Sequence, residues 1–265
     1  MKATLITGAS GGIGEAIALK LASRKQNLVL VARSEAKLKD FAEQLSKYHQ
    51  ISVEYISADL SKAGTAQQVF DETQRRNLQI ETLINNAGIG SGGEFAELSL
   101  QSELDMLQLN ISSLVALTHL FLQKMKARKG GTIINVASMA SFLPIPYMTT
   151  YSASKVFVRH FSQALTQECK PYHVHVMLLC PGLTKTNFNS AAGIEGKVGQ
   201  RLNAEYNGST PLQTPEQVAD EMLNALDKKK HYIVSGKMNR IASRLSALFP
   251  NAFLAKIFAR SYRKK

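Results

Sequence analysis

The sequence is poor in cysteine and in long apolar runs, and its carboxyl end lacks acidic residues. Its 265 residues include two cysteines, Cys169 and Cys180, which form no C-x-x-C pair and no metal-binding spacing. A reducing cytoplasmic compartment is therefore expected, without a disulfide framework or a metal site. No apolar run approaches the ~20 residues of a membrane-spanning helix. The first residues enter a predicted strand directly, so no signal peptide is expected.

Positive charge is concentrated at the carboxyl end. The formal net charge is +12, and residues 236–265 hold eight lysines and arginines and no acid, so they contribute +8 of it. A helical projection places an apolar arc beside a basic arc (Met238, Ile241, Ala242, Leu245, Leu248 and Phe249; Lys237, Arg240 and Arg244). Such a helix can lie on an anionic membrane surface, or it can dock on the protein body over a substrate cleft or a subunit interface. Nucleic-acid binding is not expected, because no binding motif accompanies the basic residues.

A glycine-rich segment follows the first predicted strand, residues 3–7. The spacing of Ile13, Ile17 and Leu21 predicts that a helix begins within this segment. Glycines let the backbone approach a pyrophosphate closely, and the unpaired N–H groups of a helix N-terminus attract an anion. We expect a phosphate-binding loop formed by Gly8, Ser10, Gly12, Ile13 and Gly14.

The second predicted strand, residues 27–32, is followed by Arg33 rather than by an acid. In dinucleotide-binding folds an acid near this place binds the adenosine ribose. An arginine can hold a 2′-phosphate through a forked, charged hydrogen bond, and the missing carboxylate removes a repulsion. The position favours NADP(H) over NAD(H); a solvated surface arginine is the alternative.

Two more strand ends carry candidate cofactor contacts. A strand over 52–57 precedes Asp59 and Leu60, and a strand over 82–85 precedes Asn86, Ala87 and Gly88. Asp59 can accept a hydrogen bond from an adenine amino group, or it can only cap the next helix, predicted over 62–76, with Ser61 competing for that role. The small residues that follow the fourth strand lie where the sheet edge should meet a cofactor.

Asn110 lies inside an otherwise apolar stretch of a helix predicted over 99–128. Asparagine disfavours helix interiors because it competes for backbone hydrogen bonds. Either the side chain is simply satisfied within the fold, or the helix is locally opened there and holds a water molecule. The locally opened helix is the more specific of the two interpretations.

Ser138, Tyr151 and Lys155 lie between a strand predicted over 132–137 and a helix that continues to about residue 167. Residues four apart on a helix lie about one turn, roughly 5.4 Å, apart on one face. A nearby cation lowers the pKa of a phenol, which is about 10 when free, toward working pH. Tyr151 can then act in general acid–base catalysis, and Ser138 can hydrogen-bond the same substrate oxygen.

The remaining pattern completes the fold class. A sixth strand over 173–180 ends in Pro181 and Gly182, and a seventh is predicted over 231–234 after a helix that begins at Thr214. His173 and His175 alternate on one strand face without a third metal ligand. Residues 187–208 are rich in glycine, asparagine and serine and indicate a mobile lid over the site. Alternating hydrophobic strands and helices predict a single-domain, doubly wound parallel sheet over 1–235, followed by a basic helical extension over 236–265.

These residues resemble the short-chain dehydrogenase/reductase family over about residues 1–235. The resemblance rests on six motifs in order: the glycine-rich segment Thr7–Gly14, Asn85–Gly88, Asn110, Ser138, Tyr151-x-x-x-Lys155 and Pro181-Gly-x-x-x-Thr186. It implies a seven-stranded Rossmann-type sheet and a nicotinamide cofactor in the single-domain branch of the family. It also implies a homodimer or homotetramer packed through the two long helices.

By this resemblance Tyr151 is the general acid/base, and Ser138 binds and polarises the carbonyl oxygen. Lys155 holds the nicotinamide ribose and lowers the tyrosine pKa, while Asn110 anchors a proton-relay water. The resemblance adds Thr186 near the carboxamide and diphosphate end of the cofactor, and the Pro181, Gly182 and Thr184 loop also joins the cofactor-binding set.

The resulting prediction is an NADP(H)-dependent oxidoreductase. It would transfer hydride between the nicotinamide and a carbonyl or alcohol of an apolar small molecule, in the cytoplasm or at a membrane surface. A cofactor-binding sensor or scaffold with little turnover is the alternative. A nucleotide-sugar epimerase or dehydratase fits the glycine motif but not the chain length.

Overall fold

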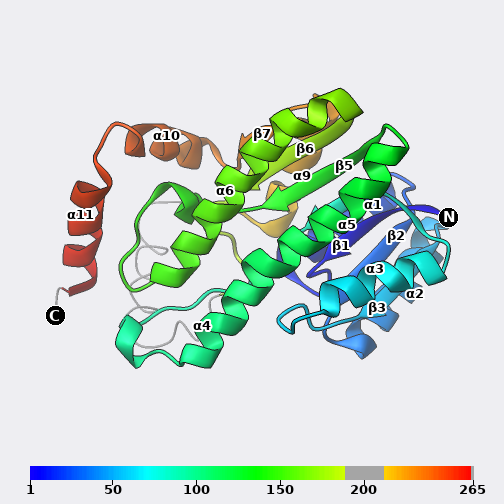
Figure 1. Ribbon diagram of the computed structural model, residues 1–265, viewed down its shortest axis with the longest axis horizontal. Coiled ribbons are helices and arrows are strands. Elements are labelled where there is room, and N and C mark those ends of the chain that lie inside the picture. Colours follow the sequence, from blue (N-terminus) through cyan, green and yellow to red (C-terminus); the bar gives the residue numbers. More distant parts are fainter. Residues whose placement is uncertain (189–211, 264–265) are drawn as a thin grey trace.

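The computed structural model describes residues 1–188 and 212–263 and contains a seven-stranded parallel sheet (Figure 1). The strand order is β3-β2-β1-β4-β5-β6-β7. The strands are β1 (Lys2–Thr7), β2 (Leu28–Ala32), β3 (Val53–Ser57), β4 (Gln79–Asn85), β5 (Gly131–Val136), β6 (Val174–Cys180) and β7 (Tyr232–Val234). The predicted Rossmann-type doubly wound α/β fold is therefore confirmed.

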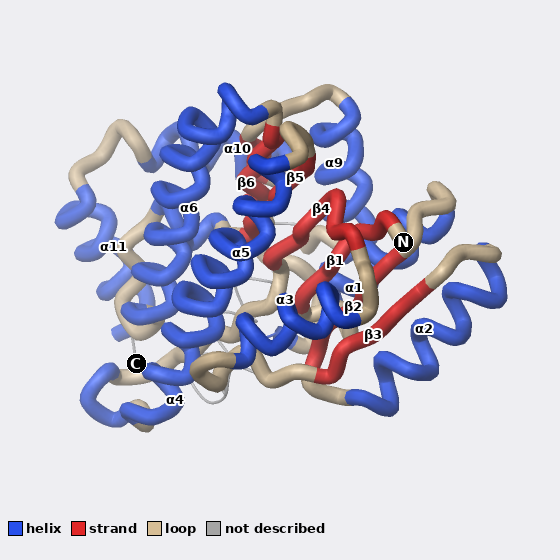
Figure 2. Tube along the Cα trace, turned by 45° about the vertical axis from the view of Figure 1, so that its right-hand side comes forward, coloured by secondary structure: helices blue, strands red, loops and turns tan. Residues whose placement is uncertain are grey.

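Helices cover both faces of the sheet, so β1, β2, β5 and β6 are buried along most of their length. They are α1 (Gly12–Ser23), α2 (Glu35–His49), α3 (Thr65–Arg75), α4 (Leu100–Leu107), α5 (Leu114–Ala127), α6 (Thr149–Cys169), α9 (Pro215–Asp227), α10 (Lys237–Ser246) and α11 (Asn251–Arg263). One core cluster joins the sheet to α1, α2 and α9, and includes Ile17, Leu38 and Met222. A second joins the other face to α3, α5 and α6, and includes Val69 and Phe121. The tube view shows the strands enclosed between these helices (Figure 2).

The strand order reverses beside β1, which pairs with β2 on one side and with β4 on the other. The chain connections leave these strands in opposite directions, so a crevice opens at their carboxyl ends. The residues that follow β1, β2, β3 and β4 all meet there. The topology thereby brings together segments that are far apart in the sequence.

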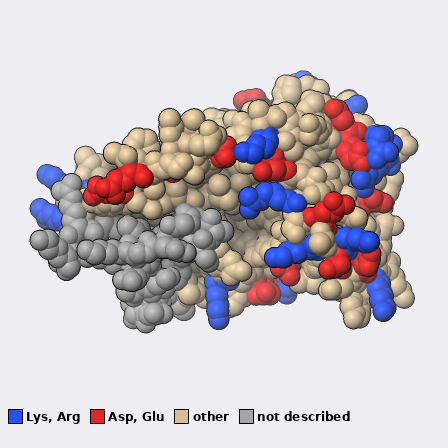
Figure 3. Space-filling view, turned by 90° about the horizontal axis from the view of Figure 1, so that it is seen from below, with Lys and Arg blue, Asp and Glu red and all other residues tan. Residues whose placement is uncertain are grey.

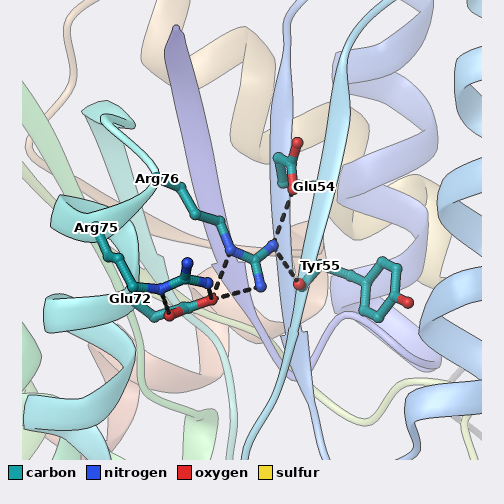
Figure 4. Close-up of polar contacts among 5 residues, drawn as sticks. All are labelled: Glu54, Tyr55, Glu72, Arg75 and Arg76. Carbon is teal, nitrogen blue, oxygen red and sulfur yellow. Dashed lines mark hydrogen bonds and ion pairs between the residues drawn. The ribbon is translucent and has the colours of Figure 1, made fainter.

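A polar cluster fastens α3 to β3, as Figure 4 shows. The Arg76 guanidinium donates to Glu72 Oε1 at 2.7 Å, to Glu54 Oε2 at 2.9 Å and to the Tyr55 carbonyl at 3.1 Å. Arg75 also binds Glu72, at 2.6 and 2.7 Å. Hydrogen bonds from the two arginines lower the pKa of Glu72 to about 2. The cluster ties the end of α3 to β3, the strand that precedes Asp59.

Two predicted boundaries were wrong. The third helix begins at Thr65 rather than at Lys62, because Gly64, at φ +81°, forms its N-cap. The fourth strand begins at Gln79, three residues before the predicted start, because the chain already pairs with β1 there. The helix predicted to begin at Thr214 is present as α9 and starts with a capping box: the Thr214 hydroxyl accepts from the Gln217 N–H, and the Gln217 side chain accepts from the Thr214 N–H.

The predicted helix over 99–128 is present as α4 and α5, joined by a π-helical turn over Gln108–Ser113. The local opening expected at Asn110 is therefore observed. Contrary to the expectation from the sequence, the combined stretch Leu100–Ala127 is long and apolar enough to cross a membrane by length and composition. In this fold α5 packs on the sheet and buries Leu117, Phe121 and Met125. Most of the predicted lid over 187–208 lies outside the described residues.

Candidate active site

The glycine-rich loop after β1 approaches the loop after β4 so closely that side chains would not fit. Gly8 has φ +67°, and a Cβ there would lie 2.9 Å from Asn86 Nδ2. A Cβ on Gly14 would collide with the Gly8 carbonyl oxygen, and one on Gly12 would lie 3.1 Å from Thr186 Cγ2. Gly8, Gly12 and Gly14 therefore build a closely packed turn at the N-terminus of α1. Ile13 points into the first core instead, where it packs against buried residues.

Thr7 and Asn86 bind the ends of β1 and β4 together. The Thr7 hydroxyl accepts the N–H groups of Asn86 and Ala87, at 3.0 and 2.9 Å, and donates to the Ile84 carbonyl. The Asn86 amide donates to the Thr7 carbonyl at 2.9 Å. The Asn86 side chain thus holds the start of the glycine loop, while Ala87 and Gly88 line the crevice.

The crevice forms a cavity of about 660 Å³. Seven predicted cofactor-binding residues line it: Gly8, Ser10, Arg33, Asp59, Leu60, Ala87 and Gly88. Space-filling shows a hollow near the middle of the face seen from below, with Lys and Arg side chains at its rim (Figure 3). Catalytic candidates Ser138, Tyr151 and Lys155 are not in its lining, so this cavity corresponds to one part of an elongated site.

Ser34 and Lys37 also line the cavity beside Arg33, and the sequence reasoning missed both. Ser34 is the N-cap residue of α2, and its side chain makes no capping hydrogen bond. Lys37 is the third residue of the same helix. The signal that could have revealed them is the spacing Arg-Ser-x-x-Lys across the start of a helix, which turns two cations and a hydroxyl toward one place.

Asp59 forms a local turn and does not cap α3, whose N-cap is Gly64. Its Oδ1 accepts from the Ser61 N–H at 3.0 Å and from the Ser61 hydroxyl at 2.7 Å. Burial raises the pKa of the Asp59 carboxyl, but these hydrogen bonds and the charges of Arg33 and Lys62 outweigh burial, so the pKa lies below its ordinary value. Asp59 is thus an ionised acceptor in the cavity wall.

Asn110 holds the loop after β4 against the π-helical turn. Its Oδ1 accepts from the Ile89 N–H at 3.1 Å, and its Nδ2 donates to the Ile89 carbonyl at 2.9 Å and to Ser154 Oγ at 3.1 Å. Both alternatives considered for Asn110 therefore apply in part: the helix is opened, and the side chain is satisfied. A Cβ on Gly88 would lie 3.1 Å from Asn110 Oδ1, so a glycine is needed beside it.

Lys155 is buried, and its ammonium group donates to the Val136 carbonyl at 3.2 Å. A Cβ on Gly88 would lie 3.2 Å from Lys155 Nζ, which places the amine next to the cavity wall. Burial lowers the pKa of Lys155 from 10.5 to about 8. Its Nζ lies 5.9 Å from the centre of the Tyr151 ring, as the four-residue spacing predicted.

Tyr151 lies in an apolar cluster. Its ring packs with the side chains of Met106, Ala140 and Met148, with Ile89, Ile145 and Phe188 at the edge. Ser138 begins the 3-10 turn Met139–Phe142, against which α6 packs. The Ser138 hydroxyl oxygen accepts from the Ala140 N–H at 3.1 Å, so its own hydrogen remains for another acceptor.

The loop after β6 joins the two halves of the site. The Pro181 carbonyl accepts from the Met139 N–H at 2.8 Å, next to Ser138, and Thr186 lies against the glycine loop through Gly12. Thr184 forms a bridge with Gln213 and donates to the Gly182 carbonyl at 3.0 Å. Gly182 packs on Asn239 of α10. Within the described residues, Gly182 and Thr184 therefore hold the loop from outside the cavity lining.

Two buried polar groups in the cavity wall have no hydrogen-bond partner among the described residues. They are the Ser91 hydroxyl and both carboxylate oxygens of Glu103, whose residue is 4% exposed. The sequence pattern did not single out Glu103, because a charged residue in the first turn of a short helix such as α4 is usually exposed. This end of the cavity offers acceptors to a ligand that carries N–H or O–H groups.

The geometry fits a dinucleotide. A glycine cradle that a Cβ would fill meets a helix N-terminus, as a pyrophosphate requires. Two cations lie at the adjoining rim of the cavity, and an ionised carboxylate lies farther along its wall. In residues 1–188 and 212–263 no three His, Cys, Asp or Glu side chains are grouped as metal ligands.

Comparison with known proteins identifies the class that this fold and site define. The family model for short chain dehydrogenase matches residues 2–195. The chain therefore belongs to the short-chain dehydrogenase/reductase family, as the motifs predicted. It is an oxidoreductase that acts on hydroxyl or carbonyl groups, and the solved structures similar to it include complexes with NADPH and with NAD.

Among individual relatives, the NADP-dependent 3-hydroxy acid dehydrogenase of Schizosaccharomyces pombe is 30% identical and covers 88% of this chain and 90% of its own. The very-long-chain 3-oxoacyl-CoA reductase of Phaeosphaeria nodorum is 35% identical over 69% of this chain and 54% of that protein. Among solved structures, a short-chain dehydrogenase from Sphingobium yanoikuyae in complex with NADPH has a TM-score of 0.82 at 29% identity, and covers 94% of this chain and 92% of its own.

Proposed function

We propose that this protein is an NADPH-dependent reductase of apolar ketones or aldehydes, with Tyr151 as the proton donor. The observation that carries the proposal is the position of Tyr151 in an apolar cluster, one helical turn from a buried lysine. An apolar wall around the acid suits a hydrophobic carbonyl, because polar substrates would lose hydration there without compensation.

The chain's own residues divide the work. When bound, the nicotinamide supplies the hydride. Tyr151 gives its phenolic proton to the carbonyl oxygen, and Ser138 donates the hydroxyl hydrogen that its bond with Ala140 leaves over. Lys155 uses one N–H on Val136, so two remain for ribose hydroxyls. With a pKa of about 8, Lys155 is mostly charged at pH 7. Its positive charge stabilises the phenolate of Tyr151 and so favours release of the phenolic proton.

Asn110 has a positioning role in this proposal. Its side chain fixes the Ile89 backbone and Ser154, and the π-helical turn leaves backbone groups out of the regular helical pattern. Such freed carbonyls can bind the water that carries protons from solvent to Lys155. Thr186, which lies beside the glycine loop, would bind the cofactor near its diphosphate.

The preference for NADPH rests on the basic rim. Arg33 and Lys37 line the cavity without an acid directly after β2, and Ser34 adds a hydroxyl. A 2′-phosphate can accept from all three, whereas a ribose hydroxyl can use few of these donors. Two of the relatives named above, from fission yeast and from Sphingobium yanoikuyae, carry NADP or NADPH in their descriptions.

We also propose a homodimer or homotetramer. Apolar side chains remain exposed on α4 and α6, which pack side by side: Leu100 at 69%, Leu104 at 49% and Phe157 at 40%. Pairing these faces about a two-fold axis would bury them. Sedimentation velocity of the purified protein at micromolar concentration tests this assembly; a monomer at every concentration would contradict it.

The function is tested by following NADPH and NADH absorbance with carbonyls graded from short polar aldehydes to long-chain and cyclic ketones. We expect turnover with NADPH that increases along the series. Tight NADPH binding without turnover on any carbonyl would contradict the reductase and favour a sensor. Faster turnover on short polar carbonyls would contradict the apolar substrate class but would still support carbonyl reduction.

A further inference from the structure

The two C-terminal helices carry a row of apolar side chains that face away from the protein body. On α10 the row follows spacings of three and four residues, so it lies on one helix face, and it continues along α11. The Phe249 and Phe253 rings stack at 5.7 Å and join the two parts. The members, 43 to 74% exposed, are Met238, Ile241, Leu245, Leu248, Phe249, Phe253 and Ile257, and we call them the apolar ridge.

The helices attach to the body through other residues. Leu254 and Ser243 are buried at 8% exposure, and Arg240 donates to Glu221 at 2.8 Å and to the Val234 carbonyl at 3.2 Å. Asn239 donates to the Ser235 carbonyl at 2.7 Å and packs on Gly182. The inner face of α10 is therefore occupied and Leu254 of α11 is buried, while the apolar ridge is left over. Ordinary surfaces rarely expose so many large apolar side chains together.

The charge around the apolar ridge selects its partner. Lys237, Arg244, Lys256 and Arg260 are exposed on the same two helices, and residues 236–265 contain no acid. A second copy docked ridge to ridge about a two-fold axis would oppose like charges. Nucleic acid would satisfy the cations but would leave the apolar side chains in water. An anionic lipid surface accommodates both, because apolar side chains enter the acyl boundary while cations meet the headgroups.

We propose that α10 and α11 form a docking surface for an anionic membrane, through which the enzyme takes apolar carbonyl substrates from the bilayer. The substrate part rests on the proposed function. Its structural basis is that α10 packs beside the 3-10 turn that follows Ser138, and is fastened to the loop after β6. Figure 1 shows both helices at the end of the molecule opposite the N-terminus, and α10 also contacts β7 at the edge of the sheet. Docking there keeps the catalytic side near the lipid.

The test is flotation of the full-length protein with vesicles of phosphatidylcholine alone or with 30% phosphatidylglycerol, a composition chosen for about one anionic lipid in three. We expect binding to the anionic vesicles that weakens at high salt. Leu248→Asp should reduce partition at least tenfold, because it loses an apolar contact and adds a repulsion. Tyr48→Asp is the matched control, because Tyr48 on α2 is 75% exposed and Leu248 is 74% exposed. This control should bind as the wild type does.

Two charge-reversal double variants test the electrostatic part of membrane docking. Lys256→Glu with Arg260→Glu should abolish the preference for anionic vesicles, whereas Lys39→Glu with Lys47→Glu on α2 should retain it. Absence of vesicle binding by the wild type would overturn the proposal. So would equal loss in the control variants. A changed sedimentation coefficient in Leu248→Asp with unchanged vesicle binding would identify the apolar ridge as a protein interface instead.

Comparing a water-soluble ketone with a membrane-embedded ketone distinguishes an effect on docking from an effect on catalysis. Leu248→Asp should retain turnover on a water-soluble ketone and lose about tenfold with a long-chain ketone embedded in vesicles. Vesicle binding without turnover on any carbonyl would refute the proposed function and leave docking in place. Equal activity of wild type and Leu248→Asp on the embedded ketone would refute delivery from the bilayer.

Discussion

At the scale of single residues, the site depends on side chains whose neighbours change their chemistry. Lys155 is buried beside Gly88, so its pKa is lowered, yet it remains within one helical turn of the Tyr151 ring. Ser138 keeps one hydrogen to donate because its oxygen is already used by Ala140. Each side chain is thus prepared for one role by a specific contact. Substitutions can separate those roles.

Tyr151→Phe should preserve NADPH binding and reduce kcat by roughly 100-fold or more, because it removes the proton donor but not the ring packing. Stopped-flow reduction of a hydrophobic ketone and a fluorescence titration of NADPH measure the two quantities. Tyr48→Phe, at an exposed position on α2, is the matched control. A kcat near the wild-type value would mean that another group supplies the proton.

Arg33→Ala should weaken NADPH binding by about 1–3 kcal/mol, the scale of a hydrogen bond to a charged group, and should spare NADH. Lys37→Ala should act in the same direction with a smaller effect, because lysine makes a single rather than a forked contact. Isothermal titration with both cofactors gives the comparison. Equal losses for NADPH and NADH would show that these cations do not contact the 2′-phosphate.

At the scale of secondary-structure elements, the π-helical turn between α4 and α5 connects the sheet edge to α6. The turn positions Asn110 so that it can bind the Ile89 backbone and Ser154 at the same time. A regular helix would present a different face at that position. Asn110 therefore lies where the helix opens and holds the loop after β4 through Ile89.

Asn110→Ala should lower the free energy of unfolding by about 1–3 kcal/mol, because the Ile89 N–H and carbonyl lose their partner in a buried place. It should also reduce kcat through disorder of the loop that carries Gly88. Urea unfolding and steady-state kinetics measure the two effects. Asn27→Ala is a matched control at a loop position, and a stability loss no larger than that control's would contradict the buried role.

At the scale of the whole molecule, one buried cation makes stability depend on pH. The pKa of Lys155 is about 8 in the folded protein and 10.5 in the ordinary, unfolded environment. Between these values the unfolded chain binds more protons, so stability should rise as pH increases from 8 to 10.5 and should be lower below pH 8.

Lys155→Met should flatten that rise, because the variant has no proton to lose in this window. Urea unfolding of the cofactor-free protein at pH 7.5, 9 and 10.5 measures it. Lys39→Met, which changes an exposed lysine on α2, should keep the wild-type slope. An unchanged slope in Lys155→Met would assign the pH dependence to other groups.

Local patterns in the sequence sufficed for the strands, for the glycine turn and for the pairing of Tyr151 with Lys155, because period and spacing determine which residues share a face. They also indicated that Asn110 would interrupt a helix. They did not reveal that Ser34 and Lys37 join Arg33 at the cavity, since side-chain direction at a helix start depends on how α2 packs. Nor could they indicate Glu103, whose carboxylate is buried without a hydrogen-bond partner among the described residues.

The sequence by itself therefore determined the family and the order of elements, and it supplied the side chains that we propose to react. Tertiary structure alone decided which strand ends meet, because the reversal beside β1 brings residues about eighty positions apart, Thr7 and Asn86, into contact. It also decided that α10 and α11 bury one face and leave the apolar ridge outside. The physical reason is that long-range packing sets burial and hence desolvation, which no local pattern specifies.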